Sequence, residues 1–219
     1  GETVQRMQED YEVEISIDNG AALAQKTWNP RLGILGGLSI LGTTGIVIPY
    51  SCAAWIASIH QGIDVARAIG IIHVAACTGK TSEEAVTALY GFEPSEILDM
   101  GDFVGGTVKY LQTNPIPKVT IASGFGKISK LAAGHMDLHS KRSQVDPKFI
   151  ASLAAKGGID KNICEQISKA ESAGNIIELI EINHLNLGDY IAEVAQNVVS
   201  RKIKNNVDFE VLVYNRKGI

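Results

Sequence analysis

The sequence predicts an α/β protein with a mostly parallel, Rossmann-like sheet, preceded by a short mixed α+β segment and followed by helices and an edge strand. Short strand-like segments recur at residues 71–76, 96–100 and 118–122. Each is followed by a glycine-containing turn that leads into a helical pattern. Strand, turn and helix in succession form the repeating unit of a parallel sheet with right-handed crossovers. With 219 residues, of which 45% are hydrophobic, the chain is long enough to bury a substantial core.

Residues 1–50 are predicted to be the remnant of an N-terminal α+β region with a glycine-rich crossover, and residues 51–219 to form the α/β domain. Acidic and aliphatic residues alternate over 12–17, which predicts a strand, and a short helix is expected at 21–26. The segment NPRLGILGGLSILGTTGIVIPYS then runs from residue 29 to residue 51 without an acidic side chain. It is apolar and long enough to suggest a membrane span, but its glycine density favours buried strands joined by tight turns. A tightly packed crossover without a ligand is the alternative for this segment.

The first helix of the α/β domain is predicted to begin after Ser51, a favourable N-cap residue, and to end near Ile69. The strand at 71–76 and the turn at 78–81 follow, with a helix expected over 82–90. The Gly-Lys-Thr triplet in this turn is not a phosphate-binding loop, because Val74 stands where the first glycine of that motif is required.

Two further units of strand, turn and helix follow. The strand at 96–100 leads through the turn GDFVGG into a helix ending near Gln112, and the strand at 118–122 leads through SGFG into a helix beginning near Lys127. Together the three units predict a doubly wound sheet, with helices on both faces.

The remaining chain is predicted to be helical before a final strand. One helix begins at Asp146-Pro147 and ends at the glycine pair 157–158, and another covers 161–172. A longer helix is expected to present one apolar face, and residues 207–214 alternate as in an edge strand. The predicted members of that helix face are Leu187, Ile191, Val194 and Val198.

Four of these segments resemble the cobalt-precorrin-5B methyltransferase family of anaerobic cobalamin biosynthesis. They are the glycine-rich segment 29–51, SIHQGIDVARAIG, ILDMGDFVGG and GFGKISKLAAGHMDLHS, and they follow one another in the family's order. The resemblance implies an S-adenosylmethionine-dependent methyltransferase that converts cobalt-precorrin-5B to cobalt-precorrin-6A by methylating carbon 1. Cobalt would enter only as part of the substrate.

The chain departs from the family's pattern in two respects. Family members carry a basic residue where Ile48 stands and acidic residues near Cys52 and Ala53. The chain also begins at Gly1, and the family's glycine- and alanine-rich N-terminal signature is not found in it. We therefore expect the C-terminal part of the enzyme, which can be inactive by itself.

The glycine turns are the predicted site of the methyl donor. In an open α/β sheet, ligands bind beyond the carboxyl ends of the strands, and helix N-termini favour carboxylates. S-adenosylmethionine offers a carboxylate and a ribose, and Asp102 is expected to bind its ribose or amino group; capping of a helix by Asp102 is the alternative. The predicted donor-binding residues are Thr43, Thr44, Gly79, Gly101, Asp102, Gly105, Gly124 and Gly126.

A second cluster gathers basic residues and histidines at 127–142. A polycarboxylate corrin ring needs local positive charge, so the segment predicts a substrate site; an exposed helix end with ordinary lysines is the alternative. His135, His139 and Asp102 are candidates for a general base. His135 and His139 are spaced to hold a metal on a helix, but no third ligand is evident, so no protein-held metal is expected. The predicted substrate-binding residues are Lys127, Lys130, Ser140 and Arg142.

Composition excludes several other classes of function. A formal net charge of −4 disfavours a nucleic-acid partner, and three cysteines without metal-binding spacing are typical of a reducing cytoplasm. No membrane partner is expected, and a homo-oligomer is compatible with the sequence. The alternative function is a non-catalytic corrinoid- or nucleotide-binding fragment whose catalytic part is missing. A dehydrogenase is disfavoured, because no GxGxxG follows a first strand.

Overall fold

The computed structural model describes residues 16–27, 29–39, 51–204 and 206–215. The chain divides into two compact units, Gly1–Val47 and Ile48–Ile219. The described part of the first unit contains the short helix α1 (Gly20–Ala24) and the 3-10 helix η1 (Asn29–Leu32). Most of the predicted strand at 12–17, residue Trp28 and the stretch 40–50, which includes Thr43 and Thr44, lie outside the described residues.

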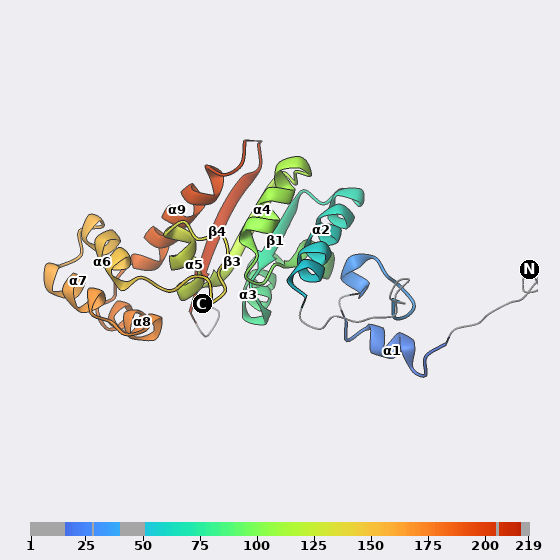
Figure 1. The fold of residues 1–219 in the computed structure, drawn as a ribbon, viewed down its shortest axis with the longest axis horizontal. Helices are drawn as coiled ribbons and strands as arrows, with labels where there is room; N and C mark the ends of the chain where they lie inside the picture. Colours follow the sequence, from blue (N-terminus) through green and yellow to red (C-terminus); the bar gives the residue numbers. More distant parts are fainter. Residues whose placement is uncertain (1–15, 28, 40–50, 205, 216–219) are drawn as a thin grey trace, which may run out of the picture. The chain divides into compact units, whose positions relative to one another are not determined.

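The second unit contains a four-stranded sheet in which every described strand runs parallel to its neighbours (Figure 1). The strands are β1 (His73–Cys77), β2 (Ile97–Asp99), β3 (Lys118–Gly124) and β4 (Asp208–Tyr214), in the spatial order β2-β1-β3-β4. The predicted α/β fold class is thereby confirmed, and β4 lies at an edge of the sheet as expected. β1 and β3 pair along their length, from His73 opposite Lys118 to Cys77 opposite Ala122.

One face of the sheet is covered by α2 (Cys52–Ala68), α4 (Val104–Thr113), α5 (Phe125–Ala132) and α9 (Leu187–Ser200). Their apolar side chains form the main core with alternate residues of all four strands, because successive strand residues point to opposite faces. The strand residues in this core are Val74, Ala76, Leu98, Val119, Ile121, Phe209 and Val211.

The opposite face is covered by α3 (Lys80–Tyr90), with the short helix η2 (Pro94–Glu96) beside it. Here the intervening strand residues form a smaller apolar cluster with Val86 and Phe92. Helices therefore lie on both faces, as a doubly wound sheet requires, but the two layers are unequal in size. The strand residues in the smaller cluster are Ala75, Cys77, Ile97 and Ala122.

Local sequence signals explain where the helices begin. The Ser51 hydroxyl accepts a hydrogen bond from the Ala54 amide at 3.2 Å and caps α2, as predicted. α6 (Pro147–Lys156) begins after Asp146, whose carboxylate accepts from the amides of Lys148 and Phe149. α5 begins at Phe125, two residues before the predicted start, so Gly126 lies inside the helix.

The structure corrects two predictions about the later helices. The single helix expected over 161–172 is α7 (Lys161–Ser168), and a separate helix, α8 (Ala173–Ile182), follows it. α7 therefore ends four residues before the predicted boundary, and α8 was not predicted; it begins after Ser172, whose hydroxyl accepts from the Asn175 amide and caps it. α6, α7 and α8 pack in sequence beside α5 and α9 (Figure 1).

The apolar face of α9 is also shifted from the prediction. Its buried residues recur at intervals of four, whereas Val194 and Val198 are only half-buried. The small Ala195 occupies the core position because α9 packs closely against α5 and β4. The buried residues of α9 are Leu187, Ile191, Ala195 and Val199.

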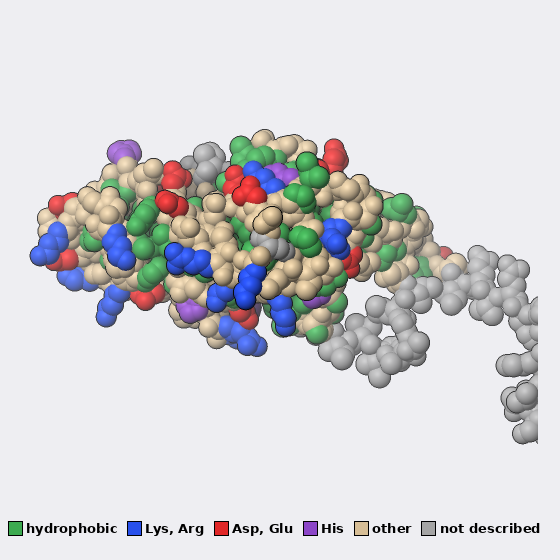
Figure 2. Space-filling view, turned by 90° about the horizontal axis from the view of Figure 1, so that it is seen from above, with side chains coloured by type: hydrophobic (Ala, Val, Ile, Leu, Met, Phe, Trp, Pro, Cys, Tyr) green, Lys and Arg blue, Asp and Glu red, His purple; other side chains and the backbone are tan. Residues whose placement is uncertain are grey.

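None of the helices in the described part of the chain combines the length and the apolar character that crossing a bilayer requires. On the face shown in Figure 2, acidic, basic and apolar side chains are interspersed over the described surface.

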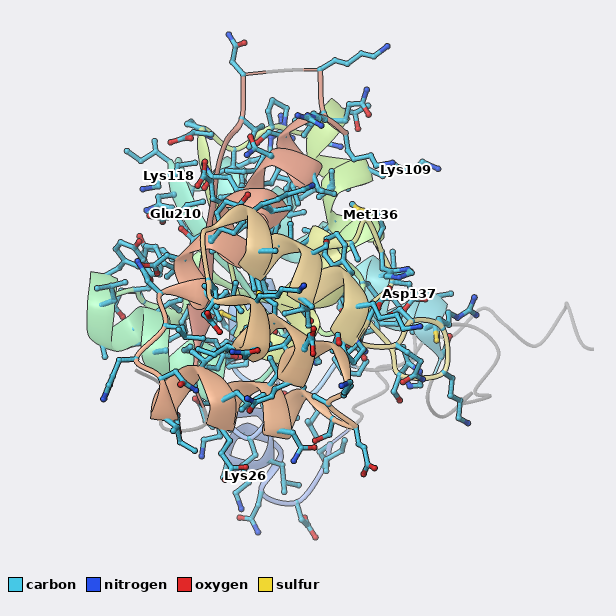
Figure 3. All side chains as sticks on the ribbon, turned by 90° about the vertical axis from the view of Figure 1, so that its left-hand side faces the viewer. Lys26, Lys109, Lys118, Met136, Asp137 and Glu210 are labelled. Carbon is cyan, nitrogen blue, oxygen red and sulfur yellow. The ribbon has the colours of Figure 1, made fainter. Side chains whose placement is uncertain are left out.

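A polar cluster on the side of the sheet covered by α3 connects β4 to neighbouring elements. Glu210 Oε2 accepts hydrogen bonds from Tyr90 at 2.6 Å and Thr120 at 2.7 Å, and it lies 3.5 Å from Lys118 Nζ (Figure 3). Thr120 thus donates its only proton to Glu210, so its oxygen accepts from His73 Nε2 at 2.8 Å. Burial would raise the pKa of Glu210, but these hydrogen bonds and Lys118 outweigh it and leave that pKa below its ordinary value.

The cluster predicts a loss of stability in acid. A carboxyl group whose pKa is depressed in the folded chain stabilises it above the ordinary pKa of 4.5, and this contribution is lost as pH falls through the folded pKa. Burial and Lys118 also lower the pKa of His73, so its protonation opposes folding as pH falls below 6.5. We expect Glu210→Gln to lower the free energy of unfolding at pH 7 by about 1–2 kcal/mol, and by less near pH 3.

Urea unfolding measured at both pH values checks this prediction. Glu178→Gln on α8 is the matched control, because Glu178 is exposed and should leave stability unchanged. Equal destabilisation of the Glu210 variant at pH 3 and pH 7 would contradict the ionic role of the carboxylate.

Candidate functional site

A pocket of about 650 Å³ lies at the carboxyl ends of β1, β3 and β4. The chain leaves β1 toward β2 on one side and leaves β3 toward β4 on the other, so the pocket occupies the point where the strand order switches. This is the position at which open α/β sheets bind their ligands. The pocket is lined by Thr78, Gly79, Lys80, Thr81, Ser123, Gly124, Phe125, Gly126, Lys127, Lys130, Val145, Ala173, Gly174, Ile177, Tyr214 and Asn215.

The turn after β1 is closed by its own serine. The Ser82 hydroxyl, which is fully buried, accepts hydrogen bonds from the amides of Thr78 at 3.0 Å and Gly79 at 3.1 Å, and it donates to the Gly79 carbonyl. Two of the amides that the sequence suggested for a ligand therefore already have a partner. Gly79 itself adopts φ 156° and ψ −179°, a backbone conformation that residues other than glycine rarely adopt.

The turn after β3 is open by comparison. α5 begins with Gly124 as its N-cap, without a side-chain hydrogen bond to its first amides. A Cβ atom on Gly126 would lie 3.3 Å from Ala173 Cβ, so glycine lets α8 approach α5 closely at this wall of the pocket. Of the three described helices that begin at the pocket, α5 is therefore the one whose first amides are not bound by a serine hydroxyl, and such amides favour a ligand oxygen.

Two lysines of α5 stand at the pocket. Lys127 Nζ lies 2.9 Å from Asp102 Oδ1 and donates to the Thr78 carbonyl at 3.3 Å. Lys130 is buried, and its Nζ donates to the Leu138 carbonyl at 2.9 Å. Burial lowers the pKa of Lys130; Asp102 opposes this shift and Lys127 adds to it.

Hydroxyl groups and apolar side chains complete the lining. Thr78 Oγ1 and Ser123 Oγ lie 2.7 Å apart across the β1–β3 pair. Burial raises the pKa of Tyr214, whereas the hydroxyls of Ser82, Thr78 and Ser123 act in the opposite direction. Val145 and Ile177 give the pocket an apolar wall that suits a flat ring or an aliphatic chain.

The structure brings five of the residues proposed from the sequence to this one pocket. They are Gly79, Gly124, Gly126, Lys127 and Lys130. Asp102 contributes through its ion pair with Lys127. Donor-site and substrate-site candidates therefore meet in the same place, although the sequence suggested two clusters.

Gly101 and Gly105 lie elsewhere and have packing roles. Gly101 has φ 56°, and a Cβ atom there would lie 3.1 Å from the Trp55 ring. The Gly105 amide donates to the Met136 carbonyl at 2.8 Å. Both follow β2, which lies at the sheet edge next to α2, so the turn after this strand does not line the pocket.

The loop after α5 carries the remaining candidates. His135, His139, Ser140 and Arg142 are exposed there, and none of them lines the pocket. The segment from His135 to His139 is not helical, so the one-turn spacing considered for a metal is not formed. Arg142 instead pairs with Asp137 at 3.2 Å. Among the described residues, no group of three His, Cys, Asp or Glu side chains could hold a metal ion.

The sequence analysis missed part of the lining. Tyr214 ends β4, and its contribution follows only once β4 is known to lie parallel to β3. Ala173 and Gly174 were missed because no helix was predicted over 173–182, although Ser172 before two small residues is a signal for a new helix start.

Comparison with protein families matches the chain at both ends. A model described as CbiD matches residues 2–49, and a model described as CbiD, C-terminal domain, matches residues 137–219. No solved structure gives a significant match.

Curated relatives cover nearly the whole chain. The protein from Paramagnetospirillum magneticum named cobalt-precorrin-5B C(1)-methyltransferase is 54% identical over 211 residues, which are 95% of this chain and 58% of that protein. Proteins of the same name from Burkholderia thailandensis and Brucella canis are each 50% identical over 95% of this chain. The chain therefore spans somewhat more than half the length of these relatives.

The backbone conformation of Gly79 leads us to expect that adding a methyl group at this position lowers the stability of the fold. A Cβ atom on Gly79 would meet no atom within 4 Å, so Gly79→Ala tests backbone conformation without steric conflict. We expect it to lower the free energy of unfolding by about 1–3 kcal/mol.

Gly188→Ala is the matched control, because Gly188 lies in α9, also with no atom within 4 Å of an added Cβ atom. It should be neutral or stabilise the chain by up to about 1 kcal/mol. Thermal unfolding of both variants checks the pair, and equal effects would contradict the argument.

Proposed function

Because the chain belongs to the CbiD family, we propose that the protein methylates carbon 1 of cobalt-precorrin-5B, yields cobalt-precorrin-6A and uses S-adenosylmethionine as the donor. The reaction comes from the names of relatives that are about half identical to this chain. The observation that carries the site is the pocket at the strand switch point, where the glycine turns of β1 and β3 meet Lys127 and Lys130.

The proposed chemistry places modest demands on the protein. The bond between the methyl carbon and the sulfonium sulfur breaks as the bond to carbon 1 forms, and the electron pair stays on sulfur. Because the donor is already activated, the protein mainly aligns the two ligands and excludes water. A pocket with an apolar wall, hydroxyl groups and no acyl-transfer machinery is consistent with this task.

Asp102, His135 and His139 remain the candidates for a general base if the acceptor must lose a proton. Asp102 contacts Lys127, so we propose that it orients that lysine in addition to any proton transfer. The two histidines are exposed on the loop after α5 and do not line the pocket.

The second candidate function is a non-catalytic fragment that binds a corrinoid or a nucleotide. This alternative is favoured by the length of the chain, which spans 58% of the relative from Paramagnetospirillum magneticum. Residues in the unmatched part of such a protein could supply the catalytic groups.

Calorimetric titration of S-adenosylhomocysteine into the chain tests the donor site, with NAD and ATP as controls. We expect saturable binding that is selective for the adenosyl-homocysteine ligand, weakened about tenfold by Asp102→Asn through the loss of the charge that orients Lys127. Equal binding of NAD or ATP would argue against a donor site.

Neutral variants of matched shape test the base candidates. Asp102→Asn, His135→Gln and His139→Gln should all remain folded in thermal unfolding, and the variant that removes a base should lower turnover by roughly 10²–10⁴-fold. Full turnover in all three variants would exclude these residues as bases.

A further inference from the structure

The pocket differs in charge from the chain that forms it. Lys80, Lys127 and Lys130 line it, and no aspartate or glutamate is among its lining residues. The whole chain carries a formal net charge of −4. Three lysines therefore gather at this pocket, of which Lys80 pairs with Glu84 and Lys127 with Asp102.

Lys130 is the buried lysine of this pocket. The residue is 8% exposed, and its ammonium group, which has three donors, makes one hydrogen bond to the protein, to the Leu138 carbonyl. Among the described residues, no carboxylate lies within ion-pair distance of Lys130 Nζ; Asp102 is paired with Lys127 and Asp137 with Arg142. A buried ammonium group is costly unless an anion compensates it.

The helix ends at the pocket favour the same kind of ligand. The first residues of α3, α5 and α8 all line it, and a helix N-terminus carries a partial positive charge. Ser82 occupies amides in the turn before α3, and Ser172 caps α8, but α5 has no side-chain cap. The amides of α5 and Lys130 of the same helix thus present donors to one space.

We infer that this pocket holds a carboxylate group of the ligand, bound by the ammonium groups of Lys130 and Lys127 and by the N-terminal amides of α5. The inference rests on the proposed function for the identity of the ligand. Asp102 acts as a positioning residue that keeps Lys127 at the pocket wall. A carboxylate here would complete the hydrogen bonding of Lys130, whereas a sulfonium beside two ammonium groups would be repelled.

Two ligands of the proposed reaction could supply the carboxylate. One is the methionine part of the donor, which would place its sulfonium toward the apolar wall at Ile177. The other is an acidic side chain of the corrin ring. The chemistry at Lys130 is the same in both cases, and matched probes separate the sources.

The experiment measures dissociation constants of two probe pairs by calorimetry on the whole chain. S-adenosylhomocysteine is compared with 5′-methylthioadenosine, which keeps the adenosine and the thioether but lacks the carboxylate and the amino group; the lysine variants then show which loss depends on the pocket. Cobyrinic acid is compared with its fully esterified form, which keeps the ring but lacks the charges. Each pair is measured with the unaltered chain, Lys130→Met, Lys127→Met and Lys109→Met.

Lys109→Met is the control for removal of a lysine charge, because Lys109 is exposed on α4, does not line the pocket and points away from the ribbon (Figure 3). Thermal unfolding of each variant verifies folding, and Lys127→Met carries the test by itself if Lys130→Met does not fold. We expect each pocket variant to weaken one carboxylate probe about tenfold to a hundredfold and its uncharged partner by less than about twofold. Lys109→Met should bind every probe as the unaltered chain does.

The affected pair identifies the source of the carboxylate. A loss confined to S-adenosylhomocysteine assigns the pocket to the donor, and a loss confined to cobyrinic acid assigns it to the corrin ring. Unchanged binding of both carboxylate probes in both lysine variants would overturn the inference while leaving the proposed function in place. No binding of either probe to the folded, unaltered chain would count against the proposed function itself.

Discussion

β1 and β3 are separated along the chain by α3, β2 and α4, yet they pair in parallel at the middle of the sheet. The pairing aligns their carboxyl ends, so the turn at Gly79 and the turn at Gly124 open on the same side. The 2.7 Å contact between the Thr78 and Ser123 hydroxyls marks where the two ends meet. The two turns line one pocket because of this pairing, and the pocket is the space that the lysines of α5 also line.

The second unit contains charged side chains in positions where burial lowers the stability of the fold. Asp102 follows β2 and Lys127 lies in α5, which follows β3, so their ion pair joins the turn after β2 to a helix after a strand that is not its neighbour. Lys130 joins α5 to the following loop through the Leu138 carbonyl. A buried lysine with one hydrogen bond is a poor choice for stability alone, and such local conflicts in otherwise consistent folds are typical of functional positions.

Glycine has different roles in turns that look alike in the sequence. At Gly79 the requirement is a backbone conformation, because space for a side chain is available. At Gly126 the requirement is the close approach of Ala173, and at Gly105 it is contact with Met136. Only some of these glycines adjoin the pocket, so a glycine turn in this fold class does not by itself indicate a ligand.

The sequence by itself determined the local structure of this protein. The strand segments, the caps at Ser51 and Asp146 and the alternation along β4 follow from periodicity and capping chemistry, which act over a few residues. The three-residue spacing of Lys127 and Lys130 also fixed both on neighbouring positions of one helix. α8 was missed, although Ser172, where the preceding predicted helix ends, caps it.

Only the tertiary structure decided which of these elements form a site. The order β2-β1-β3-β4 places the turns of β1 and β3 at the pocket and leaves Gly101 and Gly105 against α2 and the loop after α5. It also adds Tyr214 and Ala173, which lie far along the chain from the glycine turns. Strand order depends on how buried faces pack over long separations, and a local pattern carries no information about that packing.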